Sequence, residues 1–339
     1  MKNKFKKIIF IILIIVIIIF YIWSKLFFVS ILLLLILDSF TLKFLSFLLK
    51  TKLNTRFYNI LKYSYIIILP ILFAVFFRTF FFDFYYVPSS SMERTLFPGD
   101  YVLINKISYG VKLPNHLRNI PVIGGLFNPP ENEYNLYSPL QAFKELERED
   151  IIVFKAVDDS DKFLVKRIIG LPSDTIKIKN TTVYINSKEL KEKNNYTYNY
   201  VYKQKNSVSL FENYSNREYL EKTLEERAKY KKVIRDKSNY NYFLFPSSKQ
   251  ELWTRDNYGK LLIPEKGMKI DLTEENIKIY KSIVIKFENI DLTKLDESIY
   301  IFKNNYYFMM GDNRHNSIDS RVFGFVPESY IQGKMIKVF

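Results

Sequence analysis

The sequence lacks cysteine altogether among its 339 residues. Disulfide bonds are therefore excluded, so an exported domain of this chain must be held by packing and strand pairing alone. The spacing Ser-x-x-Lys also occurs nowhere in the chain. That absence argues against an acyl-enzyme of the penicillin-recognising type, in which this spacing carries the nucleophile.

The basic residues do not gather in one stretch of the sequence, although the chain carries a net charge of +15 at pH 7. Many lysines flank apolar segments near the start, and the others are mixed with Asn, Tyr and Glu over the middle of the chain. A nucleic-acid-binding surface would concentrate this charge on one face. We therefore expect no nucleic-acid partner.

Long apolar runs are present, and the first covers residues 8–37. It exceeds the roughly 20 residues that one membrane span needs, so it forms either one tilted helix or two short helices that turn near Ser24-Lys25. The basic start resembles a signal peptide, but no small-residue cleavage site follows it. Residues 1–37 are therefore predicted to be an uncleaved anchor.

The next segment, residues 38–64, is predicted to be a cytoplasmic loop. Its basic residues outnumber a single acidic one, Asp38, and basic loops stay on the cytoplasmic side. The basic residues are Lys43, Lys50, Lys52, Arg56 and Lys62.

A second apolar run, residues 65–82, is predicted to be a transmembrane helix that crosses to the outer face. The aromatic residues between 80 and 86 suit the membrane interface at its end. The alternative, a buried helix of a soluble domain, is disfavoured because runs of this length and apolarity are rare there. Charge leaves the number of crossings before residue 38 open, since the basic start also favours the cytoplasm.

The rest of the chain predicts β structure. Short runs rich in β-branched and aromatic residues alternate with Gly, Pro, Asn or Asp; they are residues 101–104, 151–154, 175–178 and 182–185. We therefore expect a membrane-anchored, mainly β protein, in which N-terminal transmembrane helices precede an antiparallel β catalytic domain with a polar insertion. The domain comprises residues 83–186 and 301–339, and the insertion, with a helix-like patch at 217–232, covers residues 187–300.

Two residues in this region predict nucleophilic chemistry. Ser91 lies in a run of three serines, 89–91, that follows the second apolar run, and chemistry alone does not choose among the three. Lys166 lies inside an apolar, strand-like run, 164–172. A serine hydroxyl needs a base, and a lysine amine can serve when burial lowers its pKa toward neutrality. The alternatives are an ordinary serine turn and a surface lysine, which both residue types form more often.

With these residues the chain resembles the bacterial type I signal peptidases, membrane-bound Ser–Lys serine proteases that remove signal peptides. Four blocks carry the resemblance, in the family's order. They are Pro88-Ser89-Ser90-Ser91-Met92 with Thr95-Leu96, Gly99-Asp100-Tyr101-Val102-Leu103, residues 148–155 leading into Lys166-Arg167 and Gly170-Leu171-Pro172, and residues 309–314 with 316–317, 319–321 and 324–327. The chain departs from the family at Arg94, Ser173 and His315, where proline, glycine and aspartate are usual.

The resemblance implies a role for each matching residue. Ser91 would be the nucleophile and Lys166 the general base, while Ser89 would help to stabilise the oxyanion. Ser317 would hydrogen-bond the base amine, Asp319 and Arg321 would brace the site as a charged pair, and Asp312 with Arg314 would do similar work. The residues that would line pockets for small side chains are Val87, Met92, Leu164 and Val165, although apolar strand residues are more often ordinary core.

The implied function is cleavage of signal peptides from exported preproteins after small residues of the Ala-x-Ala type. The reaction needs no cofactor and no metal. The partners would be these signal peptides and the lipid bilayer, with the secretion translocon close by. The protein would be a multi-pass protein of the cytoplasmic membrane, with its catalytic domain on the outer side.

The same residues allow three other interpretations. The first is a catalytically weak or inactive relative that only binds signal peptides, against which intact Ser91 and Lys166 argue. The second is a soluble Ser–Lys autoprotease of the repressor-cleaving type, against which the apolar anchor argues. The third is a Ser-His-Asp triad of Ser317, His315 and Asp319, which closeness in sequence alone does not establish.

Overall fold

A computed structural model describes residues 54–107, 112–114, 137–139, 145–159, 162–202, 210–235, 243–249 and 253–339. Its contacts divide the chain into two units, one of Met1–Phe82 with Val111–Leu140 and one of Asp83–Gly110 with Gln141–Phe339. The predicted anchor, residues 1–37, lies outside the described residues, as does the predicted loop up to residue 53. Part of the segment predicted as 83–186 therefore groups with the first unit.

The first unit contains the long helix α4, Thr55–Phe80. Asn54 caps it by accepting a hydrogen bond from the backbone N–H of Phe57 at 3.0 Å, which satisfies one of the free donors at a helix start. Among the described residues, α4 is the one helix long and apolar enough to span a membrane. The helix begins ten residues before residue 65, where the transmembrane helix was predicted to start. The prediction followed the apolar run alone, and the first turns of α4 are amphiphilic rather than apolar. The unit also contains the antiparallel pair β3 (Lys112–Pro114) and β4 (Tyr137–Pro139).

The second unit is mainly β, as the sequence predicted, and all of its paired strands with a described register are antiparallel. Its largest sheet has the strand order β1-β2-β18-β5-β6-β16-β17. These strands are β1 (Phe82–Tyr86), β2 (Tyr101–Asn105), β5 (Ile151–Lys155), β6 (Phe163–Gly170), β16 (Tyr306–Met310), β17 (Val326–Pro327) and β18 (Ile331–Val338).

Strand β5 shows why this sheet forms. Its first four residues, 151–154, are apolar without a break, so both of its faces must be covered there. Ile151 and Val153 enter one buried cluster, and Ile152 and Phe154 enter another, as the two-residue period of a strand requires. The central strands therefore lie between two apolar layers, and the next strand, β6, carries Lys166 into this interior.

The predicted insertion, residues 187–300, contributes a strand to a sheet of the second unit. A four-stranded sheet has the order β13-β7-β8-β9, so β13 from the predicted insertion pairs with β7 from before it. The strands are β7 (Thr175–Lys179), β8 (Thr182–Ile185), β9 (Lys188–Glu189) and β13 (Tyr258–Leu262). Residues 187–300 therefore do not stand apart from the strands on either side of them.

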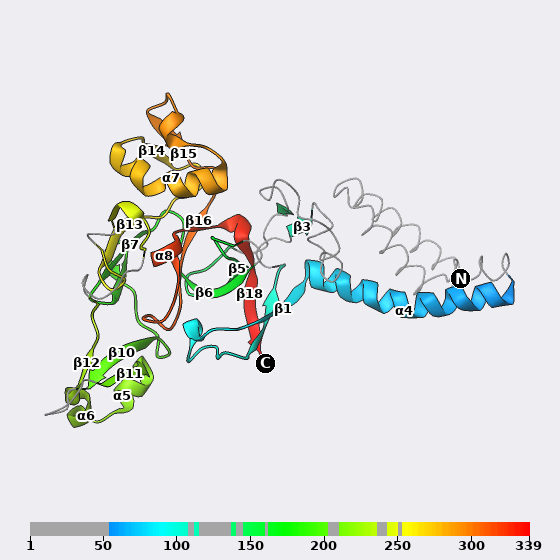
Figure 1. The fold of residues 1–339 in the computed structure, drawn as a ribbon, viewed down its shortest axis with the longest axis horizontal. Helices are drawn as coiled ribbons and strands as arrows, with labels where there is room; N and C mark the ends of the chain where they lie inside the picture. The colour runs from blue at the N-terminus through cyan, green and yellow to red at the C-terminus, as the bar shows by residue number, and fades with distance from the viewer. Residues whose placement is uncertain are drawn as a thin grey trace, which may run out of the picture. The chain divides into compact units, whose positions relative to one another are not determined.

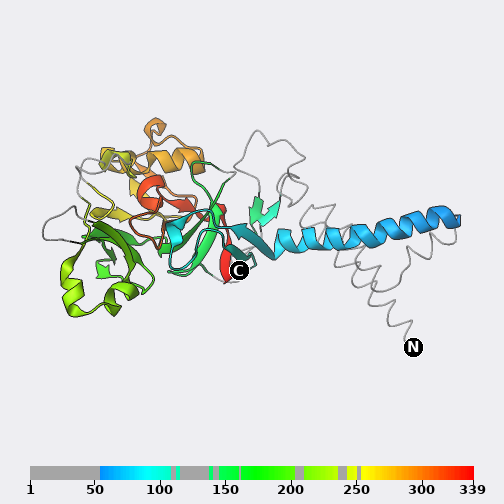
Figure 2. The ribbon, with the colours of Figure 1, turned by 60° about the horizontal axis from the view of Figure 1, so that its bottom comes forward.

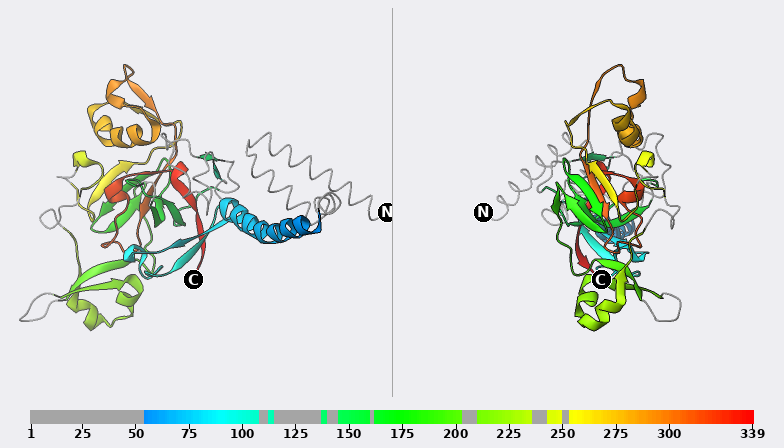
Figure 3. Two further views of the ribbon diagram at one scale, coloured as in Figure 1. Left: turned by 45° about the vertical axis from the view of Figure 1, so that its right-hand side comes forward. Right: turned by 90° about the vertical axis from the view of Figure 1, so that its left-hand side faces the viewer.

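Two further groups of elements lie at opposite ends of the second unit with the large sheet between them (Figures 1 and 3), and the short helix α8, Ser320–Phe323, belongs to neither. One group is β14 (Lys269–Asp271), β15 (Ile299–Ile301) and α7 (Glu274–Glu288). The other is the sheet β11-β10-β12 with α5 and α6, which Figure 2 shows from another side. Its elements are β10 (Thr197–Tyr202), β11 (Leu210–Ser215), α5 (Asn216–Glu221), α6 (Leu224–Lys229) and β12 (Tyr230–Lys232).

The helix-like patch predicted at residues 217–232 is therefore two short helices and a strand. Each helix starts with a capping box, Ser215 with Glu218 in α5 and Thr223 with Glu226 in α6. A capping box satisfies two free N–H groups at once, so it starts a new helix wherever it recurs. The second capping box, which begins at Thr223, starts a separate helix. The sequence pattern had instead predicted one continuous helical patch.

The departure at Ser173 lies in a tight turn. The backbone N–H of Asp174 donates to the carbonyl of Leu171 at 3.2 Å, and Ser173 has a φ of 65°. A positive φ at the third position of a turn favours glycine, the residue usual in the family that the sequence resembles.

Glycine at this position should stabilise the protein. The left-handed conformation costs a non-glycine residue about 1–2 kcal/mol, more than the extra unfolded-state entropy of glycine. Ser173→Gly should therefore raise the free energy of unfolding by roughly 0.5–1 kcal/mol. Urea unfolding of the full chain in detergent would measure this, with Ser173→Ala as a control that keeps the strain. An unchanged midpoint in the glycine variant would contradict it.

Candidate active site

The structure brings Ser91 and Lys166 into direct contact. Ser91 lies in the one-turn 3-10 helix Ser90–Met92, which follows β1, and Lys166 lies on β6. The Lys166 Nζ donates to Ser91 Oγ at 2.7 Å and to the Val165 carbonyl at 2.9 Å. Both side chains are buried, with exposed fractions of 9% and 3%. Residues 75 positions apart thus form one hydrogen-bonded pair.

Burial sets the charge of the Lys166 amine. Desolvation lowers its pKa from 10.5 to about 8, although the carboxylates of Asp319 and Asp312 act in the opposite direction. About one amine in ten is therefore neutral at pH 7, and most are neutral above pH 9. A neutral amine has a lone pair, so in that state the Ser91 hydroxyl can donate to it.

The Ser89 hydroxyl lies on the same segment. Its Oγ is 3.2 Å from Ser91 Oγ, within hydrogen-bonding distance. Of the three neighbouring serines, Ser89 and Ser91 thus direct their hydroxyls toward each other. The third, Ser90, instead accepts a hydrogen bond from Asn316 Nδ2 at 3.0 Å.

Asp319 and Arg321 form the predicted charged pair. The Arg321 guanidinium donates to both carboxylate oxygens of Asp319, at 2.9 and 2.8 Å, and both residues are almost completely buried. Arg321 also donates to the Arg314 carbonyl, and Asp319 accepts from the backbone N–H of Gly311. The pair therefore ties together both ends of the segment 311–321.

Asp312 and Arg314, the other two charged residues expected to brace the site, have separate partners. The Asp312 carboxylate accepts two hydrogen bonds from Arg167, at 2.8 and 2.6 Å, whereas Arg314 places its guanidinium 3.9 Å from the ring of Tyr196. The two residues therefore do not pair with each other. Sequence neighbours on a loop need not face each other, and Arg167 on β6 reaches Asp312 because β16, which precedes that loop, pairs with β6.

Ser317 is buried beside Ser91, but its hydroxyl makes no hydrogen bond in the described structure. The expected bond to the Lys166 amine is therefore not formed here. Gly311 lies between Ser317 and Ser91. A Cβ at this position would collide with Ser317 Oγ and with the Ser91 carbonyl oxygen. The absence of a Cβ at residue 311 lets the C-terminal segment approach Ser91 closely.

Asn313 is a site residue that the sequence reasoning missed. Its backbone N–H donates to the Ser91 carbonyl at 3.1 Å, and its Nδ2 donates to the Ser90 carbonyl and to Glu93 Oε2, each at 3.1 Å. These bonds connect the main chain at Ser90 and Ser91 to the C-terminal segment. Only its place next to Asp312 in the family-like block could have drawn attention to it.

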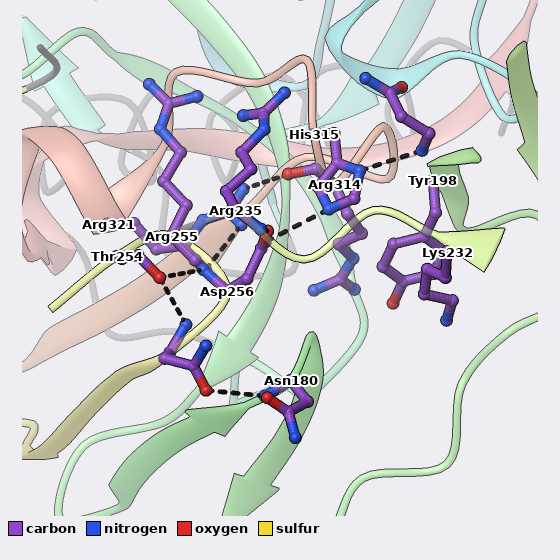
Figure 4. Close-up of polar contacts among 12 residues, drawn as sticks. Asn180, Tyr198, Lys232, Arg235, Thr254, Arg255, Asp256, Arg314, His315 and Arg321 are labelled. Carbon is purple, nitrogen blue, oxygen red and sulfur yellow. Dashed lines mark hydrogen bonds and ion pairs between the residues drawn. The ribbon is translucent and has the colours of Figure 1, made fainter. Parts of the chain in front are cut away.

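Both ring nitrogens of His315 face groups outside the suggested triad, and Figure 4 shows these surroundings. Its Nδ1 accepts from the backbone N–H of Asn199 at 2.9 Å, and its Nε2 lies 3.2 Å from Asp256 Oδ1. The carboxylate of Asp319, the third member of the suggested triad, forms an ion pair with Arg321 instead. Burial is the main cause that lowers the His315 pKa, so a neutral ring bridges β10 and the segment around Asp256.

Three of the four predicted pocket residues lie in one apolar cluster. Val87, Met92 and Val165 are buried together in this cluster. Met92 is the residue next to Ser91 in the chain, so the cluster adjoins Ser91. Leu164 is partly buried against the other cluster. Their role as a pocket lining stays a prediction.

A family model described as "Signal peptidase, peptidase S26" matches residues 60–251 and 254–339. Signal peptidase I of Buchnera aphidicola subsp. Schizaphis graminum is 33% identical over 273 residues, which cover 80% of this chain and 72% of that protein. Signal peptidase I of Aquifex aeolicus is 28% identical over 280 residues and covers 81% of each chain. A solved signal peptidase I from Enterococcus faecalis V583 shares 20% identity over 57% of this chain, with a TM-score of 0.26 that is too low to support a comparison of folds.

The family match also continues through the middle of the chain, which the four sequence blocks left uncovered. The chain therefore belongs to the signal peptidase family, peptidase S26, and is a serine endopeptidase.

Proposed function

We propose that this protein cleaves signal peptides from exported preproteins after small residues of the Ala-x-Ala type, with Ser91 as nucleophile and Lys166 as general base. The observation that carries the proposal is the 2.7 Å contact between Lys166 Nζ and Ser91 Oγ in a buried setting. Signal peptidases of this family act on signal peptides, and a Ser–Lys pair can perform acyl transfer without a histidine.

The reaction follows from this geometry. The neutral Lys166 amine takes the proton of Ser91, whose oxygen attacks the scissile carbonyl to form a tetrahedral intermediate. The Lys166 ammonium then returns a proton to the leaving amine, which leaves an acyl-enzyme on Ser91. A water molecule, activated by the same amine, hydrolyses that ester and releases the signal peptide.

The negative oxygen of the intermediate needs donors. The Ser89 hydroxyl, 3.2 Å from Ser91 Oγ, supports a role for Ser89 beside the main-chain N–H of the nucleophile. One such donor typically contributes about 3 kcal/mol to the stabilisation of the transition state.

The preference for small residues would arise from Val87, Met92, Leu164 and Val165. Val87, Met92 and Val165 are buried together next to Ser91. A pocket with this apolar lining would favour an alanine methyl group and oppose a charged side chain. An extended peptide adds to a sheet edge with alternate side chains in such pockets, which suits a motif read at every second residue.

The placement of the site at the outer membrane surface is part of the same proposal. Helix α4 is long enough to cross a bilayer, and β1 begins directly after it with exposed Phe82, Phe84 and Tyr86. Aromatic side chains favour the membrane interface. Confinement of the enzyme and the signal peptide to one surface, close to the translocon, would bring the scissile bond to Ser91 without a long search.

Removal of either member of the pair should abolish activity. We expect Ser91→Ala and Lys166→Ala each to lower kcat by on the order of 10⁴-fold or more, and the double variant to be little worse. The assay is cleavage of a purified preprotein in detergent, with the N-terminus of the product sequenced. Ser90→Ala, which alters the neighbouring hydroxyl, should lose less than tenfold. Substantial turnover by Ser91→Ala would overturn the assignment, and wild-type binding without cleavage would favour an inactive relative.

The pH dependence should report the Lys166 amine. Because the protonated amine cannot accept the serine proton, kcat/KM should rise with pH through a pKa of about 8 and then level off. At pH 7 the rate should be about one tenth of the plateau. A rise centred below about pH 6, or one that disappears in His315→Ala, would instead indicate a histidine base.

Thiol labelling can test the topology, since the chain has no cysteine of its own. Lys266 is exposed in the second unit, and Thr51 lies in the predicted cytoplasmic loop. With an impermeant reagent, Lys266→Cys should react in intact cells and Thr51→Cys only after lysis. The opposite pattern would place the catalytic unit in the cytoplasm.

A further inference from the structure

The segment that follows the nucleophile is held by the middle of the chain. We define residues 90–96 as the nucleophile loop. Arg94 donates from Nε to Glu218 Oε2 at 3.1 Å and places its second nitrogen 3.0 Å from Oε1, a two-bond clasp to α5. Asn213 on β11 donates to Glu93 at 3.3 Å, and Asn195 contacts the Thr95 hydroxyl. Three successive residues of the loop thus contact one group of elements.

The backbone of the loop needs such support at Arg94. Its φ is 69°, a left-handed conformation that costs a side-chain-bearing residue about 1–2 kcal/mol. Proline, which is usual here in the family that the sequence resembles, cannot adopt it, because its ring holds φ near −65°. Such a conformation persists where the surroundings favour it strongly. The clasp to Glu218 supplies that constraint at the same residue.

Glu218 is itself held rigidly. It occupies the third position of α5, where its carboxylate accepts the backbone N–H of Ser215 at 2.8 Å and the Ser215 hydroxyl at 2.9 Å. Burial alone would raise the Glu218 pKa, but these bonds and the charge of Arg94 lower it. The carboxylate that meets Arg94 is therefore charged at neutral pH and fixed in direction by its capping role.

The same group of elements also holds the opposite side of the site. The N–H of Thr197 on β10 donates to the Asp312 carbonyl, and the N–H of Arg314 donates to the Thr197 carbonyl, each at 2.9 Å. Asp312 and Asn313 in turn contact the nucleophile loop. Residues 195–218 are thus connected to both segments that form the site.

We propose that Arg94 and Glu218 are positioning residues for catalysis, through which residues 195–218 hold the nucleophile loop so that Ser91 Oγ stays in hydrogen-bonding reach of Lys166. This inference rests on the proposed roles of Ser91 and Lys166. Neither Arg94 nor Glu218 touches the reacting atoms. Their effect arises because misplacement of a reacting group by about 1 Å can lower a rate by as much as about 10²-fold.

The clasp should affect catalysis much more than stability. The side chains of Arg94 and Glu218 are 34% and 37% exposed, and ion pairs with this exposure contribute little to the free energy of unfolding. A kinetic effect without a matching loss of stability would therefore distinguish positioning from a merely structural role.

Glu218→Gln tests the inference with a matched control in the same helix. Glutamine can keep the capping box but loses the charge that binds Arg94. We expect kcat for preprotein cleavage to fall roughly tenfold, while KM stays within twofold. Glu221→Gln removes the exposed ion pair with Arg217, one turn away, and should match wild type within twofold.

Arg94→Gly provides a second variant that should fold well. Glycine adopts the left-handed conformation without strain, so the free energy of unfolding should be kept or raised while kcat falls as in Glu218→Gln. The double variant should be no worse than the worse single variant, because both changes remove one interaction. An Arg94→Gly enzyme with wild-type kcat would overturn the inference.

Hydrogen exchange of the peptide covering residues 88–98 provides a measurement that does not depend on the reaction. Its amides should exchange at least several-fold faster in Glu218→Gln and Arg94→Gly than in wild type and Glu221→Gln. Unchanged exchange in these two variants would overturn the inference even if activity fell. Failure of wild type to cleave any preprotein would refute the proposed function instead, and exchange would still decide whether the clasp holds the loop.

Discussion

Desolvation of the Lys166 amine is the constraint on which the rest of the site depends. A net shift of its pKa from 10.5 to about 8 means that the surroundings disfavour the charged form by about 3 kcal/mol, with burial as the main cause. The carboxylates of Asp312 and Asp319 oppose the effect of burial, and each is paired with its own arginine, Arg167 or Arg321. The two buried ion pairs therefore brace the loops and also limit the negative potential at the amine, which keeps a useful fraction of it neutral.

Ser91, the proposed nucleophile, lies where two segments that are far apart in the chain meet. Gly311 permits close approach of the C-terminal segment, and the backbone N–H of Asn313 binds the Ser91 carbonyl. The sheet sets this meeting, because β16 pairs with β6, so the loop after β16 emerges beside the lysine strand. Strand β10 then closes the arrangement by its hydrogen bonds to Asp312 and Arg314.

The three departures from the family pattern each lie in a distinct local setting. Arg94 and Ser173 adopt left-handed conformations, one beside a fixed carboxylate and the other in a tight turn. His315 uses one ring nitrogen to accept from Asn199 and directs the other toward Asp256. Arg94 and His315 face the middle of the chain, which indicates that residues 187–300 and the catalytic segments are adapted to each other.

The sequence by itself determined the apolar helix and the β character of the rest, because these depend on local patterns. It singled out Ser91 and Lys166 as a candidate pair through the family-like blocks around them, because serine and lysine alone are too common to identify a site. It could not determine which arginine meets Asp312, that His315 faces Asp256, that Ser317 lacks a hydrogen bond, or that β13 joins β7 across the middle of the chain. Those facts depend on contacts between residues distant in sequence, which strand register and loop conformation decide together. Only the tertiary structure sets register between distant strands, since each strand alone shows which of its faces is apolar but not which partner covers it.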